Sequence, residues 1–311
     1  MPRLSVVIPT FNRINFIESS IFSVLDQTVL PYEIIVIDDG STDNTYKIFE
    51  NNFNFINVNY VRQKNSGAGA ARNFGISLAK GDFIAFLDSD DIWRPQKLEH
   101  FFDALAHDPD IGFYYTPTCS MLQPTEMHDI QDVEFSRRTD KMFLLKSFMT
   151  RTPTVIVRKD LAQFPGVAFG TRRTCEDYAF FWRAVILAKK IGFSPYCDTL
   201  VRDSENSIRK SVTFGKIAED QFLTIHEVVA WIDENGLDSK FKEPLMELLA
   251  WQWKNLLAYD AINCDWKALL THAQIDILSP TFFYRLRKML GAARLVFSKR
   301  QREWIRKYAA L

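Results

Sequence analysis

The sequence predicts an α/β fold in which a mostly parallel β-sheet is covered on both faces by helices. Two observations predict it. Short, mostly apolar runs recur through the first 116 residues, and segments with apolar residues at helical spacing separate them. Strands that are apolar on both faces are typical of a parallel sheet buried between helices.

The expected elements alternate along this region. The strands, each a short apolar run, are Leu4–Ile8, Glu33–Ile37, Val58–Val61, Phe83–Leu87 and Ile111–Tyr115. The helices between them are Phe16–Leu25, Asp43–Phe49 with Ser41 or Thr42 as its cap, and Ala68–Ala79, and Pro95 suits the first turn of another. Because crossovers in such a sheet are right-handed, ligands are expected beyond the carboxyl ends of the strands.

The second half of the chain is less regular. A further strand is expected over Thr154–Val157 and a helix over Glu176–Ala188. From Lys216 the apolar residues keep helical spacing almost to the end, with Pro244 and Pro280 as breaks. The chain therefore divides into an α/β domain over residues 1–205 and a helical region over residues 206–311.

Charge is balanced overall and concentrated at one end. The 311 residues carry 38 basic and 38 acidic side chains, so nothing in the composition favours nucleic acid as a partner. Residues 284–311 contain nine basic residues and one acidic residue, a net charge of +8. Apolar residues recur there at helical spacing from Phe283 to Phe297. Such a basic amphipathic segment over residues 281–311 either lies on an anionic membrane or packs on the body with a solvated basic face.

The cysteines predict neither a disulfide framework nor a zinc site. Cys119, Cys175, Cys197 and Cys264 are scattered, without a Cys-x-x-Cys pair or a nearby histidine. A reducing cytoplasm fits that usage best. The chain also has no run of roughly 18 apolar residues, so we expect no membrane span.

Acidic residues follow the second and fourth expected strands. Asp38 and Asp39 follow the second, and Asp88, Asp90 and Asp91 follow the fourth, so up to five carboxylates share one sheet edge. Two such charges about 5 Å apart repel by roughly 3 kcal/mol at an effective dielectric near 20, which calls for a cation, an arginine or hydrogen-bond donors. Oxygen-rich acidic sites suit Mg²⁺ or Mn²⁺ bound to a diphosphate. Each motif taken alone is an ordinary turn or helix cap.

The motifs in this order resemble a known family. The chain carries VVIPTFNR, SVLDQT, EIIVIDDGSTDNT, NSGAGAARNFGISLAKGDFIAFLDSDDIW and PQKL, and then CEDYAFFWR at residues 175–183. This succession resembles the family 2 glycosyltransferases of the GT-A fold, densely over residues 4–116 and more loosely beyond. The resemblance implies a nucleotide-sugar-binding half over residues 1–116 and an acceptor half over residues 117–205.

The resemblance also implies roles for single residues. Pro9, Thr10, Phe11 and Asp39 would hold the nucleoside, because a carboxylate accepts a base N–H and an aromatic ring packs near the base. Asp88 would lie at the ribose or behind the metal, and Asp90 would touch the metal. Arg13 and Arg72 would lie near the base or phosphates, or equally form structural ion pairs.

The implied base of the reaction is Asp177. It lies in the Glu176-Asp177 pair at the start of the expected helix, where acidic residues otherwise only complement the helix dipole. The spacing of Gln301-Arg-Glu-Trp304 does not match the Gln-x-x-Arg-Trp motif of processive polymerases, which favours the transfer of single sugars.

The resemblance therefore implies an inverting transfer of one sugar from a nucleoside diphosphate sugar, with a UDP-sugar favoured, to an acceptor hydroxyl. Mn²⁺ or Mg²⁺ would assist, and the acceptor would be a saccharide or a lipid-linked molecule of bacterial surface polysaccharide or lipopolysaccharide synthesis. We expect a cytoplasmic protein, at the inner face of the membrane if the basic segment binds there. The alternatives are a nucleotide-sugar-binding module without transfer and a sugar nucleotidyltransferase.

Overall fold

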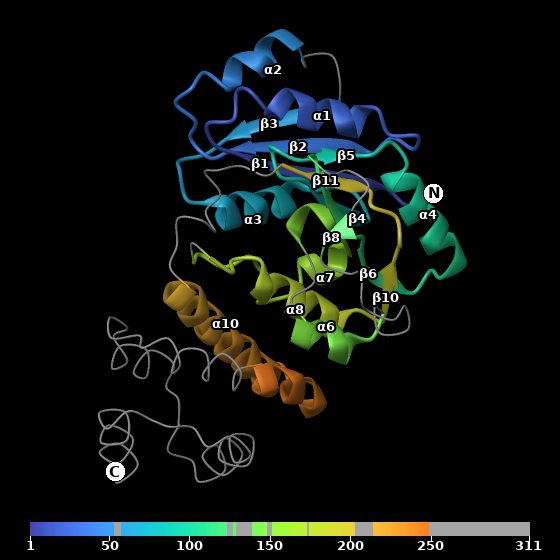
Figure 1. Ribbon diagram of the computed structural model, residues 1–311, viewed down its shortest axis with the longest axis vertical. Helices are drawn as coiled ribbons and strands as arrows, with labels where there is room; N and C mark the ends of the chain where they lie inside the picture. The colour runs from blue at the N-terminus through green and yellow to red at the C-terminus, as the bar shows by residue number, and fades with distance from the viewer. Residues whose placement is uncertain are drawn as a thin grey trace.

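A seven-stranded sheet forms the centre of the computed structural model, with helices on both sides of it (Figure 1). The structure describes residues 1–52, 57–122, 127–128, 139–147, 151–172, 174–202 and 214–248. The strand order in the sheet is β10-β6-β9-β4-β1-β2-β3. Its strands are β1 (Leu4–Thr10), β2 (Glu33–Asp38), β3 (Val58–Arg62), β4 (Phe83–Phe86), β6 (Ile111–Tyr115), β9 (Ile156–Arg158) and β10 (Lys190–Phe193).

The sheet is mostly parallel, which confirms the expected fold class. Strand β1 pairs in parallel with β2 and β4, β2 with β3, and β10 with β6. Strand β9 is the exception, because it runs antiparallel between β4 and β6. The sequence predicts a strand at this place without its direction.

Alternate residues of the central strands point into two separate cores. On one face, Val6 and Ile34 pack with α1 (Ile17–Leu25), α2 (Tyr46–Asn52) and α4 (Lys97–His107). On the other face, Val7 and Ile35 pack with α3 (Ala68–Leu78), α6 (Lys141–Ser147), α7 (Lys159–Ala162) and α8 (Tyr178–Leu187). The central strands are apolar at nearly every position because both faces are covered.

The expected C-terminal helices begin with α10 (Phe214–Glu234), which lies along α8 (Figure 1). Its residues Phe222, Ile225 and Trp231 belong to the same hydrophobic core as α8. The described residues also form two short 3-10 helices, η1 (Thr152–Thr154) and η2 (Ser239–Phe241). Most of the expected helical region, including the basic segment 281–311, lies outside the described residues.

A second, four-stranded sheet has the order β5-β11-β7-β8. It contains β5 (Ile92–Trp93), β7 (Thr118–Ser120), β8 (Met127–His128) and β11 (Thr199–Val201). Because β7 and β11 are parallel neighbours, they bring together two segments that are far apart in the sequence.

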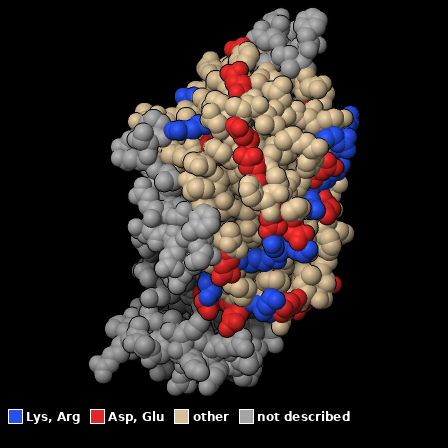
Figure 2. Space-filling model, turned by 90° about the vertical axis from the view of Figure 1, so that its right-hand side faces the viewer, with Lys and Arg blue, Asp and Glu red and all other residues tan. Residues whose placement is uncertain are grey.

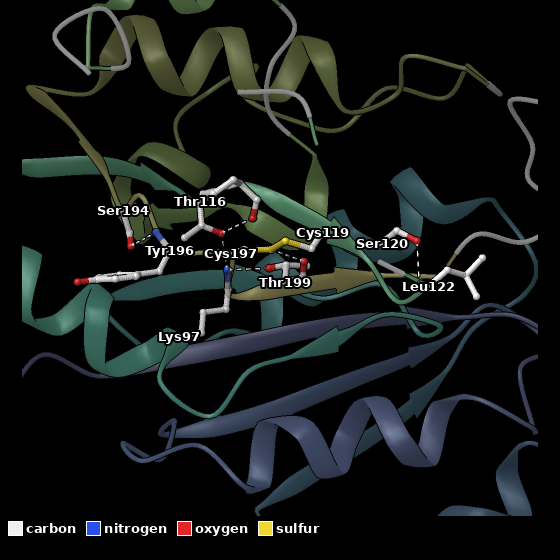
Figure 3. The surroundings of a disulfide bond; sticks show 10 residues. Lys97, Thr116, Cys119, Ser120, Leu122, Ser194, Tyr196, Cys197 and Thr199 are labelled. Atoms are coloured by element: carbon white, nitrogen blue, oxygen red, sulfur yellow. Dashed lines mark hydrogen bonds between the residues drawn. A yellow bond between two sulfur atoms is a disulfide. The ribbon is translucent and has the colours of Figure 1, made fainter. Parts of the chain in front are cut away.

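A disulfide bond joins Cys119 of β7 to Cys197, two residues before β11, and the expectation of no disulfide is therefore wrong (Figure 3). The two cysteines are 78 residues apart in sequence, yet their Cα atoms are 6.1 Å apart because β7 pairs with β11. Spacing along the chain does not reveal such a pairing. The Cys175 thiol is free, and burial raises its pKa to about 12. Cys264 lies outside the described residues.

The surface of the described residues mixes both signs of charge. On the face shown in Figure 2, acidic and basic side chains lie beside one another. The exposed pairs Lys189–Asp110 and Lys190–Asp108, at 2.6 and 2.7 Å, are of this kind. None of the described helices is both long and apolar enough to cross a membrane.

Candidate active site at the carboxyl edge of the sheet

The parallel register brings the expected site residues to one edge of the sheet. Thr10 pairs with Asp38, and Asp38 pairs with Arg62, so β1, β2 and β3 end side by side. The backbone N–H of Leu87, just after β4, donates to the carbonyl of Val7. The acidic segment that follows β4 therefore begins at the same edge as the segments after β1 and β2, as the sequence predicts.

Both aspartates at the end of β2, Asp38 and Asp39, accept hydrogen bonds from several donors. The Asp39 carboxylate accepts from the Gln63 side chain at 2.7 Å and from the backbone N–H groups of Ser66 and Gly67 at 2.8 Å. Gly67, with φ of 91°, immediately precedes α3. Asp39 therefore fixes the loop that leads into α3, whatever else it binds.

Asp38 has a different set of donors. It accepts from the Ser41 backbone N–H at 2.7 Å and from the Tyr60 hydroxyl. Burial and the neighbouring Asp38 raise the pKa of Tyr60, so its phenol remains a donor. These contacts hold the turn after β2 in one conformation.

The segment after β1 offers an apolar ring beside a buried hydroxyl. Thr10 is buried, and its Oγ1 has no hydrogen-bond partner among the described residues. The Phe11 side chain is 43% exposed although it lies in the middle of the edge. Asn12, at φ of 52°, holds the turn by donating its backbone N–H to Ser41 Oγ. A buried hydroxyl without a partner is costly in a folded protein and is readily explained by a ligand or water.

Arg72 connects the acidic segment after β4 with the start of α8. From α3 its Nη2 lies 2.7 Å from Asp88 Oδ1, and its Nη1 lies 3.2 Å from Glu176 Oε1. The guanidinium also lies over the Phe169 ring, 5.2 Å from its centroid. Although burial alone lowers the pKa of Arg72, Asp88, Glu176 and Asp177 together raise it. Of the two roles left open for Arg72, the structure shows the ion pair.

Asp90 and Asp91 lie in a crowded acidic environment. Asp90 Oδ2 is 3.5 Å from Arg13 Nε, so Arg13 also forms an ion pair. Burial, followed by the charge of Asp88, raises the pKa of Asp90. The same two causes raise the pKa of Asp91 well above its usual range. Both shifts mean that burial and the charge of Asp88 outweigh the positive charge of the arginines nearby.

A divalent cation fits this donor set. Carboxylate oxygens are the ligands that Mg²⁺ and Mn²⁺ prefer, and a cation would relieve the repulsion that raises both pKa values. Within the described part of the chain, no group of three or more His, Cys, Asp or Glu side chains is arranged to hold a metal. Mg²⁺ is usually bound by one or two carboxylates together with water and phosphate oxygens.

Asp177 lies immediately before α8, and its side chain does not cap that helix. Instead, the Thr152 hydroxyl of η1 donates to Asp177 Oδ2 at 3.2 Å. The backbone reaches this position through Cys175, whose φ is 63°, and through a hydrogen bond from Gly170 N–H to the Glu176 carbonyl. Because Glu176 contacts Arg72, Asp177 is the immediate neighbour of the ion pair that reaches Asp88.

The model of the family called glycosyl transferase family 2 matches residues 5–164, which is 160 of the 311 residues. The chain belongs to glycosyltransferase family 2. The matched region contains all the strand ends described above and stops short of Asp177.

Curated relatives that are named as glycosyltransferases agree with this assignment. An uncharacterized glycosyltransferase of Haemophilus influenzae is 31% identical over 220 residues, covering 67% of this chain and 82% of the relative. Another from the same organism is 28% identical over 194 residues, and the match spans 62% of this chain and 64% of that protein. The putative teichuronic acid biosynthesis glycosyltransferase TuaG of Bacillus subtilis is 45% identical over 101 residues, 32% of this chain and 40% of that protein.

Solved structures of low sequence identity show the same fold. Residues 1–349 of Staphylococcus aureus TarS, in complex with UDP-GlcNAc, match with a TM-score of 0.67 at 22% identity over 89% of this chain and 79% of that one. The mannosyltransferase PcManGT of Pyrobaculum calidifontis, in complex with GDP-Man and Mn²⁺, matches with a TM-score of 0.58 at 17% identity over 91% of this chain and 83% of that one. The family 2 chain therefore has the GT-A fold.

Three contacts of this family 2 site have no counterpart in the sequence analysis. They are Gln63 with Asp39, Thr152 with Asp177, and Arg202, whose backbone N–H donates to Asp91 Oδ1 and whose Nε donates to the Asp90 carbonyl. The last two join segments 25 and more than 100 residues apart. No local pattern in the sequence marks these residues.

Proposed function

We propose that this protein transfers one sugar from a nucleoside diphosphate sugar to an acceptor hydroxyl. The observation that carries the proposal is the Arg72 bridge, which joins Asp88 of the acidic edge to Glu176 beside Asp177. A donor held at the edge would then have a carboxylate base close to its sugar. The S. aureus neighbour solved with UDP-GlcNAc supports a uridine donor.

The nucleoside would be bound by the segments after β1 and β2. The half-exposed Phe11 ring can pack against a base, and the buried Thr10 hydroxyl has hydrogen-bonding capacity that the described residues leave unused. Pro9 shapes this segment. Asp39 is already held by Gln63, Ser66 and Gly67, so it would present a fixed carboxylate to a base N–H.

Asp177 would remove the proton from the acceptor hydroxyl. The acceptor oxygen would attack the anomeric carbon on the side opposite the diphosphate. The bond between the anomeric carbon and the diphosphate oxygen would break, and its electron pair would leave with the diphosphate. A single displacement of this kind inverts the anomeric configuration. The Thr152 hydroxyl would hold the Asp177 carboxylate in the orientation that this attack requires.

Asp90 is the residue that would hold Mn²⁺ or Mg²⁺, with Asp88 behind it. When bound, the cation supplies charge neutralisation for the departing diphosphate. Arg13 lies against Asp90 and would exchange this contact for one with a phosphate oxygen. The Mn²⁺ complex of the P. calidifontis neighbour supports the choice of metal.

The acceptor would be a saccharide or a lipid-linked molecule of surface polysaccharide synthesis, as the match to TuaG supports. The net charge of +8 over residues 284–311 supports contact with an anionic membrane. Sedimentation with phosphatidylserine vesicles tests this contact. Equal binding by a variant with the basic residues of 284–311 changed to Gln would contradict it.

A donor panel tests the proposed function. The protein is heated with UDP-, GDP- and dTDP-sugars, with and without Mn²⁺, and nucleoside diphosphate release is then measured for each sugar that shifts the unfolding midpoint. We expect one nucleotide class to bind, with Mn²⁺ enhancing both binding and release. As a control, Asp110→Asn changes a carboxylate at the opposite edge of the sheet and should respond to the donors as the wild type does. Binding without release or transfer favours the binding module, and no response to any donor refutes the proposal.

A further inference from the structure

One lysine near the candidate site has a completely buried side chain. Lys97 is the first residue of α4, and its side chain has no exposed surface. Its Nζ lies 3.1 Å from Thr199 Oγ1 and 3.4 Å from Thr116 Oγ1 (Figure 3). It also lies 3.5 Å from the Thr154 carbonyl oxygen. The ammonium group also lies 5.1 Å from the centroid of the Trp93 ring.

This ammonium group has no paired carboxylate among the described residues. A buried charge without a counter-ion costs more than an apolar side chain of the same size at the same place. Burial accordingly lowers the pKa of Lys97 to about 8. Three oxygen atoms match its three N–H donors, so the side chain acts as a junction between the three segments that supply them.

One of these segments leads to Asp177. The Thr154 carbonyl belongs to η1, the single turn that also carries Thr152 and its hydrogen bond to Asp177. The Thr199 hydroxyl donates to the neighbouring Pro153 carbonyl at 3.2 Å, and the Trp93 indole N–H donates to the same oxygen at 2.9 Å. Lys97, Thr199 and Trp93 therefore hold η1 through hydrogen bonds to its backbone carbonyls.

The second segment leads to the acidic edge. Thr199 begins β11, and the chain leaves this strand at Arg202. Arg202 donates its backbone N–H to Asp91 Oδ1 at 3.0 Å and its Nε to the Asp90 carbonyl at 3.2 Å. Lys97 thus contacts both the turn that orients Asp177 and the strand that secures the Asp90 segment.

We infer that Lys97 is a positioning residue that sets Asp177 relative to the Asp90 segment, an inference that rests on the proposed transfer reaction. It touches neither donor nor acceptor. Its loss should therefore slow the transfer step and leave donor binding intact, because the nucleoside segments after β1 and β2 do not contact it. If Lys97 only filled the core, its loss would lower stability and would not slow the transfer step selectively relative to donor binding.

The test compares Lys97→Met, Thr152→Val and the double variant with the wild type. We expect Lys97→Met to lower kcat by about 10- to 100-fold, because small misplacements of a catalytic group have effects of that size. The donor KM and the donor-induced thermal shift should stay within about twofold. Because both residues act through η1, the double variant should be about as slow as the slower single variant.

Lys189→Met, an exposed lysine paired with Asp110, is the matched control and should keep wild-type kinetics. If Lys97→Met does not fold, Thr199→Val is used in its place, since it keeps the lysine and removes one of its oxygen partners. It should lower kcat in the same direction by a smaller factor. Wild-type kcat in the folded variant, a raised KM alone, or independent effects in the double variant would overturn the inference.

The wild type and Asp177→Asn separate this inference from the proposed function. If the wild type transfers no sugar, the proposed function fails and the inference falls with it. If the wild type is active and Asp177→Asn is inactive, a normal kcat for Lys97→Met refutes only the role of Lys97.

Discussion

Arg72 Nη2 lies 2.7 Å from Asp88 Oδ1, while Nη1 of the same guanidinium reaches Glu176 Oε1 at 3.2 Å. One buried arginine thus holds the acidic edge against the segment that carries Asp177. Removing it would leave two partly buried carboxylates without their counter-ion, which is more costly than replacing the whole cluster by apolar groups.

Arg72→Met is therefore expected to lower the free energy of unfolding by about 3 kcal/mol. Urea denaturation at neutral pH measures the change. The control is Arg3→Met, since Arg3 and Asp82 form an exposed pair at 3.9 Å. That change should cost less than about 1 kcal/mol. Equal stabilities of the two variants would show that the Arg72 bridge is not a structural element.

Asp177→Asn should nearly abolish sugar transfer while donor binding persists, because the amide cannot accept the proton of the acceptor hydroxyl. Nucleoside diphosphate release and the donor-induced thermal shift are measured on the same samples. The Thr152 hydroxyl can still donate to the amide oxygen, so the unfolding midpoint should hardly change. Normal turnover in this variant would remove Asp177 from the reaction.

Asp90→Asn should lose the response to Mn²⁺. A neutral amide is a weaker ligand for a hard cation, and the variant also lacks a charge that, after burial and Asp88, raises the pKa of Asp91. The unfolding midpoint is measured against Mn²⁺ concentration in the presence of the best donor. Asp103→Asn, on the exposed face of α4, is the control. An unchanged Mn²⁺ response in Asp90→Asn would place the metal elsewhere.

Asp91→Asn should be more stable than the wild type at neutral and higher pH. The pKa of Asp91 is raised in the folded protein, so the ionised side chain destabilises the fold above that pKa. The penalty disappears as the pH falls below the ordinary aspartate pKa of about 3.9, where folded and unfolded forms are both protonated. Asn keeps the acceptor for the Arg202 N–H.

The unfolding midpoints of Asp91→Asn and the wild type are compared from about pH 4, near the ordinary aspartate pKa, up to about pH 8. The advantage of the variant should grow as the pH rises. A constant difference across the range would show that Asp91 is not a charged, buried group in the folded protein.

Removing the disulfide should destabilise the protein. Cys119 and Cys197 close a loop of 78 residues, and cross-links of this kind typically contribute about 2–4 kcal/mol. Cys119→Ser is compared with the wild type by urea denaturation without reductant, and Cys175→Ser serves as the free-thiol control. Mass spectrometry after alkylation should find Cys119 and Cys197 modified only after reduction. Their modification without a reductant would contradict the bond.

Local patterns predict the central elements well. Val7 and Ile35 stand in mostly apolar runs, and such runs become strands buried on both faces. Helix α2 begins later than expected, at Tyr46, because Asp43 accepts hydrogen bonds from the N–H and hydroxyl of Thr45 and closes a turn first. At an aspartate, a helix competes with a turn that the side chain closes by accepting backbone N–H groups. Composition alone does not decide between them.

The sequence by itself determined that apolar strands end in acidic and small residues, because runs of apolar residues and the motifs that follow them are properties of neighbouring positions. It therefore placed Asp39, Asp88 and Asp90 at one edge. Only the tertiary structure decided which partners neutralise them. Arg72 meets Glu176 across 104 residues, and Cys119 meets Cys197 across 78. Such contacts depend on strand order and on the antiparallel insertion of β9, which local spacing does not encode.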